Sequence, residues 1–148
     1  MSNDDNETTS DTEPIFHLVA FEGVHYDLAA PAPLLHFRES EGEQRPFVIA
    51  IGVADAIAIA AASQGRTSPR PSSSDLLSIV LESFGADIIA VRFVRVEGGV
   101  VFTELDVMSN VGRRIFDCRP SDAVALALRS PSTPVLVNTA IVESLAGR

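Results

Sequence analysis

The spacing of apolar and polar residues predicts seven short strands. Most of these segments alternate between apolar and polar side chains, which is typical of strands with one buried face. Residues 46–51 are almost continuously apolar, which favours a buried strand. The Gly98-Gly99 pair between two alternating segments predicts a tight hairpin. The predicted strands are residues 15–22, 34–38, 46–51, 88–96, 100–108, 111–117 and 134–137.

Four further segments have the composition and spacing of helices. Residues 53–64 are rich in alanine, whose small side chain allows close approach to a sheet. A second helix is expected to begin after a cap at Ser73 or Ser74 and to end at Gly85. The segment 120–130 is apolar nearly all round, which indicates burial, and residues 139–145 form a last short helix. In the second helix, five residues at helical spacing are expected to form a buried stripe: Leu76, Leu77, Val80, Leu81 and Phe84.

Pairs and runs of strands with helices between some of them predict the fold class. We expect an α+β fold, with a mixed, mostly antiparallel β-sheet and three to four packed helices in a single domain. Residues 1–13 are acidic, polar and without periodicity, which predicts a disordered tail. The predicted domain therefore spans residues 14–148.

The charge of the chain restricts its partners. Its formal net charge is −9, with 20 acidic residues against 11 basic ones, and every basic residue is arginine. A protein that binds duplex nucleic acid without sequence preference is expected to be basic. Contact with DNA or RNA would therefore need a small local cluster of arginines or a bridging cation.

The chain also predicts a location. Its longest apolar stretch, residues 47–62, contains Asp55 and is shorter than the roughly 20 residues of a membrane span. Cys118 is the single cysteine, so an intramolecular disulfide is impossible and a reducing compartment is favoured. The N-terminus lacks the apolar run of a secretory signal. We therefore expect a cytoplasmic protein with no membrane partner.

The densest group of charged residues lies where the strand 111–117 passes into the helix 120–130. Asp117, Arg119, Ser121 and Asp122 gather at this junction. Backbone N–H groups at a helix start are unpaired and the helix dipole is positive there, so the junction either binds an anion or caps itself. In the first case, the carboxylates hold a divalent cation and Arg119 contacts phosphate. In the second case, Ser121 and Asp122 cap the helix while Arg119 pairs with a nearby acid.

A similar group stands at the start of the preceding helix. Arg-Pro, then Ser, then Asp occurs in Arg70–Asp75 as it does in Arg119–Asp122. Proline suits a helix start because its missing N–H would be unpaired there. Arg70 would contact phosphate from a stiff loop, or would lie in an ordinary surface loop before a capped helix. Asp55 would add a third carboxylate to a shared site or, as the favoured alternative, stabilise the start of its own helix.

Several of these segments resemble the bifunctional nuclease family, a group of small α+β domains described as cleaving both DNA and RNA. The specific part runs from Asp117 to Arg129 and reads D-x-R-P-S-D-A-x-x-L-A-L-R. The likeness covers most of the chain after its N-terminal tail. Further similar segments are residues 47–56, 70–77, 97–105 and 134–137.

The resemblance implies a nuclease that hydrolyses phosphodiester bonds of DNA and RNA with a divalent cation (Mg²⁺, Mn²⁺ or Ca²⁺) and no organic cofactor. The cation ligands would be Asp75, Asp117 and Asp122, which together with Arg119 would form the catalytic group. Arg70, Arg119 and Ser121 would contact the substrate. This chain has Ser73-Ser74-Asp75 where the family usually has Thr-His-Asp, so a general base or metal ligand at that His would be missing.

A non-catalytic role is the alternative. The negative charge, Ser74 at the family's His position and the apolar helix 120–130 also fit a binding or assembly module. Such a module would recognise a small anion or a partner protein. The all-round apolar helix further predicts a homo-oligomer, either a dimer or a trimer.

Overall fold

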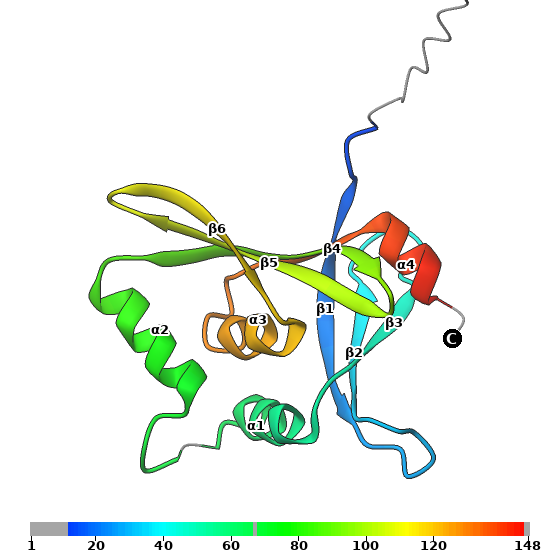
Figure 1. The fold of residues 1–148 in the computed structure, drawn as a ribbon, viewed down its shortest axis with the longest axis horizontal. Helices are drawn as coiled ribbons and strands as arrows, with labels where there is room; N and C mark the ends of the chain where they lie inside the picture. The colour runs from blue at the N-terminus through cyan, green and yellow to red at the C-terminus, as the bar shows by residue number, and fades with distance from the viewer. Residues whose placement is uncertain (1–11, 67, 147–148) are drawn as a thin grey trace, which may run out of the picture.

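The computed structural model describes residues 12–66 and 68–146, which form one seven-stranded sheet with helices packed on it (Figure 1). Along the sheet the strands follow the order β3-β2-β1-β7-β4-β5-β6. The strands are β1 (Phe16–His25), β2 (Leu34–Glu39), β3 (Pro46–Ala50), β4 (Asp87–Glu97), β5 (Val100–Ser109), β6 (Gly112–Cys118) and β7 (Val135–Asn138). The predicted disordered tail, residues 1–13, falls almost entirely outside the described residues.

The sheet consists of two antiparallel three-stranded meanders joined by β7. In the first meander β1 pairs with β2 and β2 with β3, and in the second β4 pairs with β5 and β5 with β6. β7 runs antiparallel to β1 and parallel to β4, so that Val135 faces Val19 on one side and Val91 on the other. This topology confirms the predicted α+β fold with a mixed, mostly antiparallel sheet.

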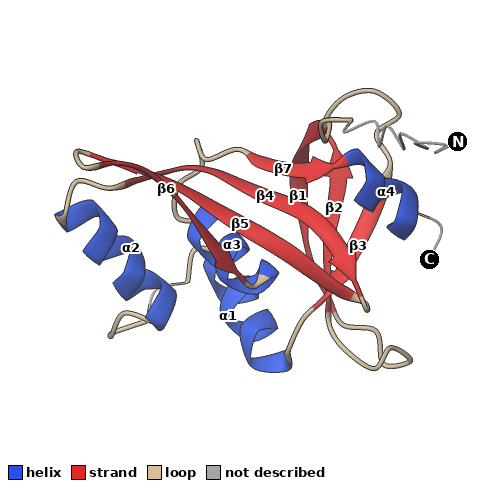
Figure 2. Ribbon diagram, turned by 45° about the horizontal axis from the view of Figure 1, so that its top comes forward, coloured by secondary structure: helices blue, strands red, loops and turns tan. Residues whose placement is uncertain are grey.

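Four helices accompany the sheet: α1 (Val53–Ser63), α2 (Ser73–Ser83), α3 (Pro120–Ala127) and α4 (Thr139–Leu145). In Figures 1 and 2, α1, α2 and α3 lie together on one side of the sheet, whereas α4 lies at the end near β3. α3 packs against α1, α2, β4 and β5, and α4 packs against β3, β4 and β7. None of the helices in the described part of the chain is long and apolar enough to cross a membrane.

The prediction that 120–130 is a buried helix is confirmed in α3. Every residue from Ala123 to Ala127 is buried, as is Ser121. Ala123 and Leu126 join the apolar cluster beneath β4 and β5, while Val124 and Ala125 join the larger cluster that contains Phe37, Phe47 and Phe93. α3 therefore connects the two parts of the core.

The prediction of a buried stripe on α2 is wrong. No residue of α2 is buried, and Leu76, Leu77, Val80 and the following Phe84 are all exposed. Leu81 alone among the five predicted residues packs, partly buried, against the cluster under β4 and β5. Helical spacing correctly identified the helix, but α2 packs chiefly against α3, and among the described residues most of its apolar side chains stay exposed. The predicted cap is also shifted, because Ser72 caps this helix rather than Ser73 or Ser74.

Candidate functional site

The start of α3 is built around Arg119. β6 ends at Cys118, Arg119 is the N-cap residue of α3 in an extended backbone conformation, and Pro120 occupies the first turn. The Arg119 guanidinium donates two hydrogen bonds to Asp122, from Nε to Oδ2 at 2.9 Å and from Nη2 to Oδ1 at 2.8 Å. Its Nη1 donates a third to Asp55 Oδ2 at 3.3 Å. One guanidinium thus links the first turns of α1 and α3.

This cluster of Arg119, Asp122 and Asp55 is charged and open to solvent. The side chains of Arg119, Asp122 and Asp55 are 65%, 45% and 34% exposed. Hydrogen bonding from Arg119 lowers the pKa of Asp122 below its usual range, and the same bond, with the charges of Asp122 and Asp55, raises the pKa of Arg119. Arg119 and Asp122 are therefore both ionised at neutral pH. Two carboxylates facing one guanidinium leave a formal charge of −1.

The start of α2 is built in a different way. Ser72 and Asp75 form a capping box, in which the Asp75 N–H donates to Ser72 Oγ at 3.2 Å and the Ser72 N–H donates to Asp75 Oδ2 at 2.9 Å. The Ser72 hydroxyl donates to the same carboxylate oxygen at 2.8 Å, and the guanidinium of Arg129 donates to Asp75 Oδ1. Hydrogen bonds from Arg129 and then from Ser72 hold the pKa of Asp75 well below its usual range.

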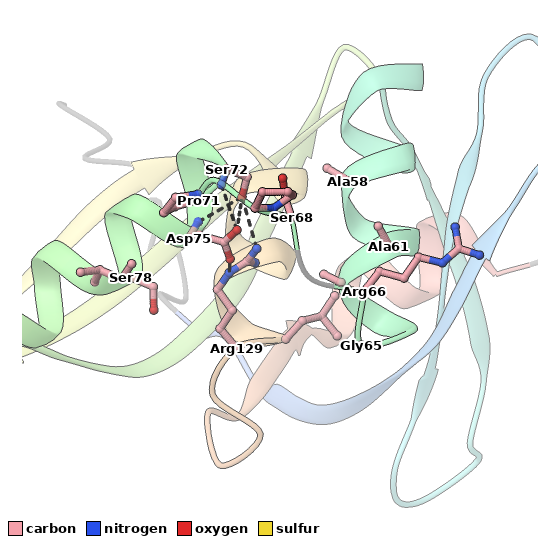
Figure 3. Close-up of a pocket in the computed structure, with 14 residues that line it drawn as sticks. Ala58, Ala61, Gly65, Arg66, Ser68, Pro71, Ser72, Asp75, Ser78 and Arg129 are labelled. Atoms are coloured by element: carbon pink, nitrogen blue, oxygen red, sulfur yellow. Dashed lines mark hydrogen bonds and ion pairs between the residues drawn. The ribbon is translucent and has the colours of Figure 1, made fainter.

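A cavity of about 670 Å³ lies beside this second cluster, between α1, the loop that follows it, the start of α2 and the end of α3 (Figure 3). Its α1 wall consists of small residues, including Ala58 and Ala61, and Leu128 and Ile79 add apolar surface. Asp75 and Arg129 form part of its lining, and Arg66 also lines it, although the Arg66 side chain extends away from the Asp75–Arg129 pair in Figure 3. The cavity therefore combines an apolar wall with the Asp75–Arg129 ion pair.

The predicted site residues do not all meet at one place. Asp122 and Arg119 are in contact, but Asp75 pairs with Arg129. Asp117 lies on β6 opposite Glu104. Because Leu105 and Val107 face α3, Glu104 and Asp117 lie on the opposite face of the sheet. Within residues 12–66 and 68–146, no three His, Cys, Asp or Glu side chains are grouped closely enough to hold a metal ion.

The two remaining predicted substrate contacts have contrasting surroundings. Arg70 is exposed on the loop before α2 and does not line the cavity. Ser121 is buried, with 5% of its surface exposed, in the first turn of α3. Arg70 is therefore accessible to a large ligand, whereas Ser121 is enclosed.

Two functional residues were missed by reasoning from the sequence. Arg129 is the last residue of the family motif and had no predicted role, yet its guanidinium binds Asp75, which lies 54 positions earlier in the sequence. Ser72 was passed over as the cap in favour of its two neighbours. The spacing of Ser72 and Asp75, three positions apart and directly after Pro71, is the capping-box signal that would have identified it.

The fold defines a small α+β domain in which two arginine–carboxylate clusters lie at the starts of α2 and α3. The family model described as the bifunctional nuclease domain matches residues 35–147. The chain therefore belongs to the bifunctional nuclease domain family, as the resemblance predicted. β1 precedes the matched region, although it lies within the sheet between β2 and β7.

Similarity to curated proteins extends over much of the chain. Two uncharacterized proteins of Mycobacterium tuberculosis, one from strain CDC 1551 / Oshkosh and one from strain H37Rv, are each 33% identical to it over 120 residues. The alignment covers 81% of this chain and 70% of each relative. Their names describe no activity, so the similarity supports the family and adds nothing about the reaction.

Proposed function

We propose that this protein hydrolyses phosphodiester bonds of DNA and RNA, and that the cluster of Arg119, Asp122 and Asp55 is the centre of its active site. The observation that carries the proposal is an exposed guanidinium held between two carboxylates at the start of a helix. Membership of the bifunctional nuclease domain family supports the same reaction class. DNA or RNA would bind at this local site, because the net charge of −9 opposes broad electrostatic attraction.

The proposed role of Arg119 is to exchange partners. A phosphodiester oxygen offers the planar guanidinium the same paired acceptors as a carboxylate does. When phosphate replaces Asp122 and Asp55 on Arg119, both carboxylates are released next to the bound phosphate. They can then accept a proton from, or orient, an attacking water molecule.

A divalent cation in this cluster would bind two carboxylates, rather than the three that the sequence predicted. Asp122 and Asp55 would hold it, in keeping with the tendency of Mg²⁺ to bind one or two carboxylates together with substrate phosphate. Such a cation would neutralise charge on the phosphoryl oxygens and lower the pKa of a bound water. Asp75 and Asp117 lie outside the Arg119 cluster, so we assign Asp75 the positioning of α2 through Arg129.

The test compares cleavage of single-stranded DNA and RNA in Mg²⁺, Mn²⁺ or Ca²⁺ by the wild type, Asp122→Asn and Arg119→Gln. We expect either substitution to lower the rate by about 100-fold, as for other groups that act on developing charge. Asp87→Asn is the matched control, since Asp87 is exposed and has no ion-pair partner in the described residues. Equal cleavage by all four proteins, or none by the wild type, would contradict the proposal.

A non-catalytic anion-binding role is the second candidate. It is favoured by the largely apolar cavity between α1 and α2, which Arg66 and Arg129 help to line, and by Ser74 at the family's His position. A thermal-shift series with inorganic phosphate and a sugar phosphate, each with and without EDTA, separates the candidates. Stabilisation that persists in EDTA and is lost in Arg66→Gln favours this role, whereas stabilisation that requires a divalent cation favours the nuclease.

A further inference from the structure

The two edges of the sheet differ in how they are protected. β3 begins with Pro46 and is covered by α4, two features that block the pairing of an edge strand with another chain. β6 lies at the other edge, contains no proline and packs chiefly against β5. A seven-residue strand with an open edge is thus available on one side of the sheet.

The exposed edge strand also carries apolar side chains. Ile115 and Phe116 are each about half exposed, at 49% and 48%, and Val111 in the preceding turn is exposed as well. Ile115 pairs with Asp106 and shares its face of the sheet, whereas Phe116 pairs with Leu105 on the face that α3 covers. Apolar residues on both faces of an open edge strand are a signature of β-sheet extension.

We infer that β6 pairs antiparallel with β6 of a second copy of this chain, about a twofold axis through Ile115, so that two seven-stranded sheets become one continuous sheet. A twofold axis perpendicular to the sheet keeps each residue on its own face. Two residues that face each other across the axis must therefore have sequence numbers that differ by an even number. This requirement leaves only those registers in which the twofold axis passes through a residue, which then faces its own copy. This inference does not depend on the proposed nuclease activity.

The charges of the facing side chains decide which central residue of β6 lies on the twofold axis. Centring on Arg114 would place two Arg114 guanidinium groups opposite each other, and centring on Phe116 would place Arg113 opposite Arg119. Like charges directly opposite each other destabilise a sheet. Centring on Ile115 alone places Arg113 opposite Asp117 of the second copy, twice by symmetry.

The same register gives complementary neighbours to the other side chains. Ile115 faces Ile115 of the second copy, and Arg114 faces Phe116, an arrangement that suits a cation–π contact. Asp117 and Arg114 make no ion pair with the rest of the described chain, so both are available. Arg113 binds Asp106 through Nε and Nη2, which leaves Nη1 to meet Asp117.

The register also brings the partner to the proposed active site. The last facing pair within β6 joins Gly112 of one copy to Cys118 of the other. The next pair, just outside the strand, places Val111 of one copy opposite Arg119 of the other. The hairpin turn before β6 would then flank the cluster of Arg119, Asp122 and Asp55 in the second copy. Each dimer would carry two such clusters, one at each end of the shared edge.

The oligomeric state is measured by sedimentation and light scattering at a protein concentration on the order of 100 μM, well above the micromolar range of weak pairs. We expect a wild-type dimer and an Ile115→Lys monomer with an unchanged circular dichroism spectrum, because two lysines would meet at the axis. Ile57→Lys is the matched control, since Ile57 is similarly exposed on α1 and should leave the dimer intact. A wild-type monomer or trimer, or an Ile115→Lys dimer, would overturn the inference.

Cross-linking tests the register itself. Residues opposite each other in an antiparallel pair have Cα atoms about 4.5–5.5 Å apart, within the range of a disulfide. Ile115→Cys should therefore form a covalent dimer under mild oxidation, whereas Ile57→Cys should not. The native Cys118 should stay reduced, because burial raises the pKa of its thiol to about 11. Failure of Ile115→Cys to cross-link faster than Ile57→Cys would contradict the register, whatever the outcome of the cleavage assays.

Discussion

α2 and α3 begin with the same residue types and end in opposite environments. An Arg-Pro pair precedes the cap of α2 and forms the cap and first residue of α3, and in both a serine and then an aspartate follow in or just before the first turn. α3 has six buried residues in its eight, whereas α2 has none in eleven. Similar local sequence therefore marks that a helix starts nearby, while the surroundings of the helix decide whether it is buried.

The arginines show the same contrast. Arg119 binds the aspartate of its own helix, three positions away. Arg70, in the Arg-Pro pair before α2, does not bind Asp75, which pairs with Arg129 from the segment after α3. The Arg119–Asp122 pair is consequently local to the start of α3, while the start of α2 takes its arginine from the segment after α3. An ion pair that reaches between the helices is one of the few contacts that attach α2 to the domain.

Shortening a leucine in each helix should give the largest difference. Leu126→Ala in α3 removes a side chain that is 3% exposed, and we expect a loss of about 2–5 kcal/mol in the free energy of unfolding. Leu76→Ala in α2 removes one that is 55% exposed, and its cost should stay within about 0.5 kcal/mol. Urea unfolding followed by circular dichroism measures both. If Leu76→Ala and Leu126→Ala lost similar amounts of unfolding free energy, the apolar side of α2 would have to be buried in solution.

Acidification should act on the attachment of α2. The Asp75 pKa is lowered in the folded state, so the Asp75–Arg129 pair contributes its full stability above the unfolded pKa of about 3.9 and loses it as the pH falls further. Asp75→Asn should cost about 1–2 kcal/mol at pH 7, a value kept small because the carboxylate is one-third exposed. The difference from wild type should shrink as the pH falls from 4 towards 2. A constant difference in melting temperature across this range would contradict the pairing.

The two serines should give the smallest effects. Ser72→Ala removes the cap of α2 and should cost about 1 kcal/mol. Ser121→Ala should be within about 0.5 kcal/mol, because α3 has no side-chain cap and begins with a proline. Thermal unfolding of the two variants at neutral pH measures this difference. A larger loss in Ser121→Ala would mean that the two helix starts are stabilised in the same way.

The sequence was sufficient to predict the strands and helices, because each is indicated by a pattern of residues that lie close together in the chain. Alternation over 100–108 and the Gly98-Gly99 turn predicted the β4–β5 hairpin, and the all-round apolar pattern of 120–130 predicted the burial of α3. The exposure of Leu76 and Phe84 could not be predicted, since helical spacing reveals an apolar side but not what covers it.

The candidate site was harder to predict because its contacts are long-range. Arg119 with Asp122 follows from spacing within one helix turn, but Arg119 with Asp55 and Arg129 with Asp75 join segments that are 64 and 54 positions apart. Such pairs depend on how α1, α2 and α3 pack. The sequence alone therefore left open whether Asp55 belongs to the cluster and did not place Asp117 on the far face of the sheet.

The position of β7 has a consequence for how the chain folds during synthesis. Among the strands that the structure describes, β7 comes last in sequence, yet it alone hydrogen-bonds to both meanders. Until Asn138 has left the ribosome, the N-terminal and C-terminal halves of the sheet have no strand to join them, and each exposes an unpaired edge. Folding into one cooperative unit is thus delayed until translation of the domain is nearly finished.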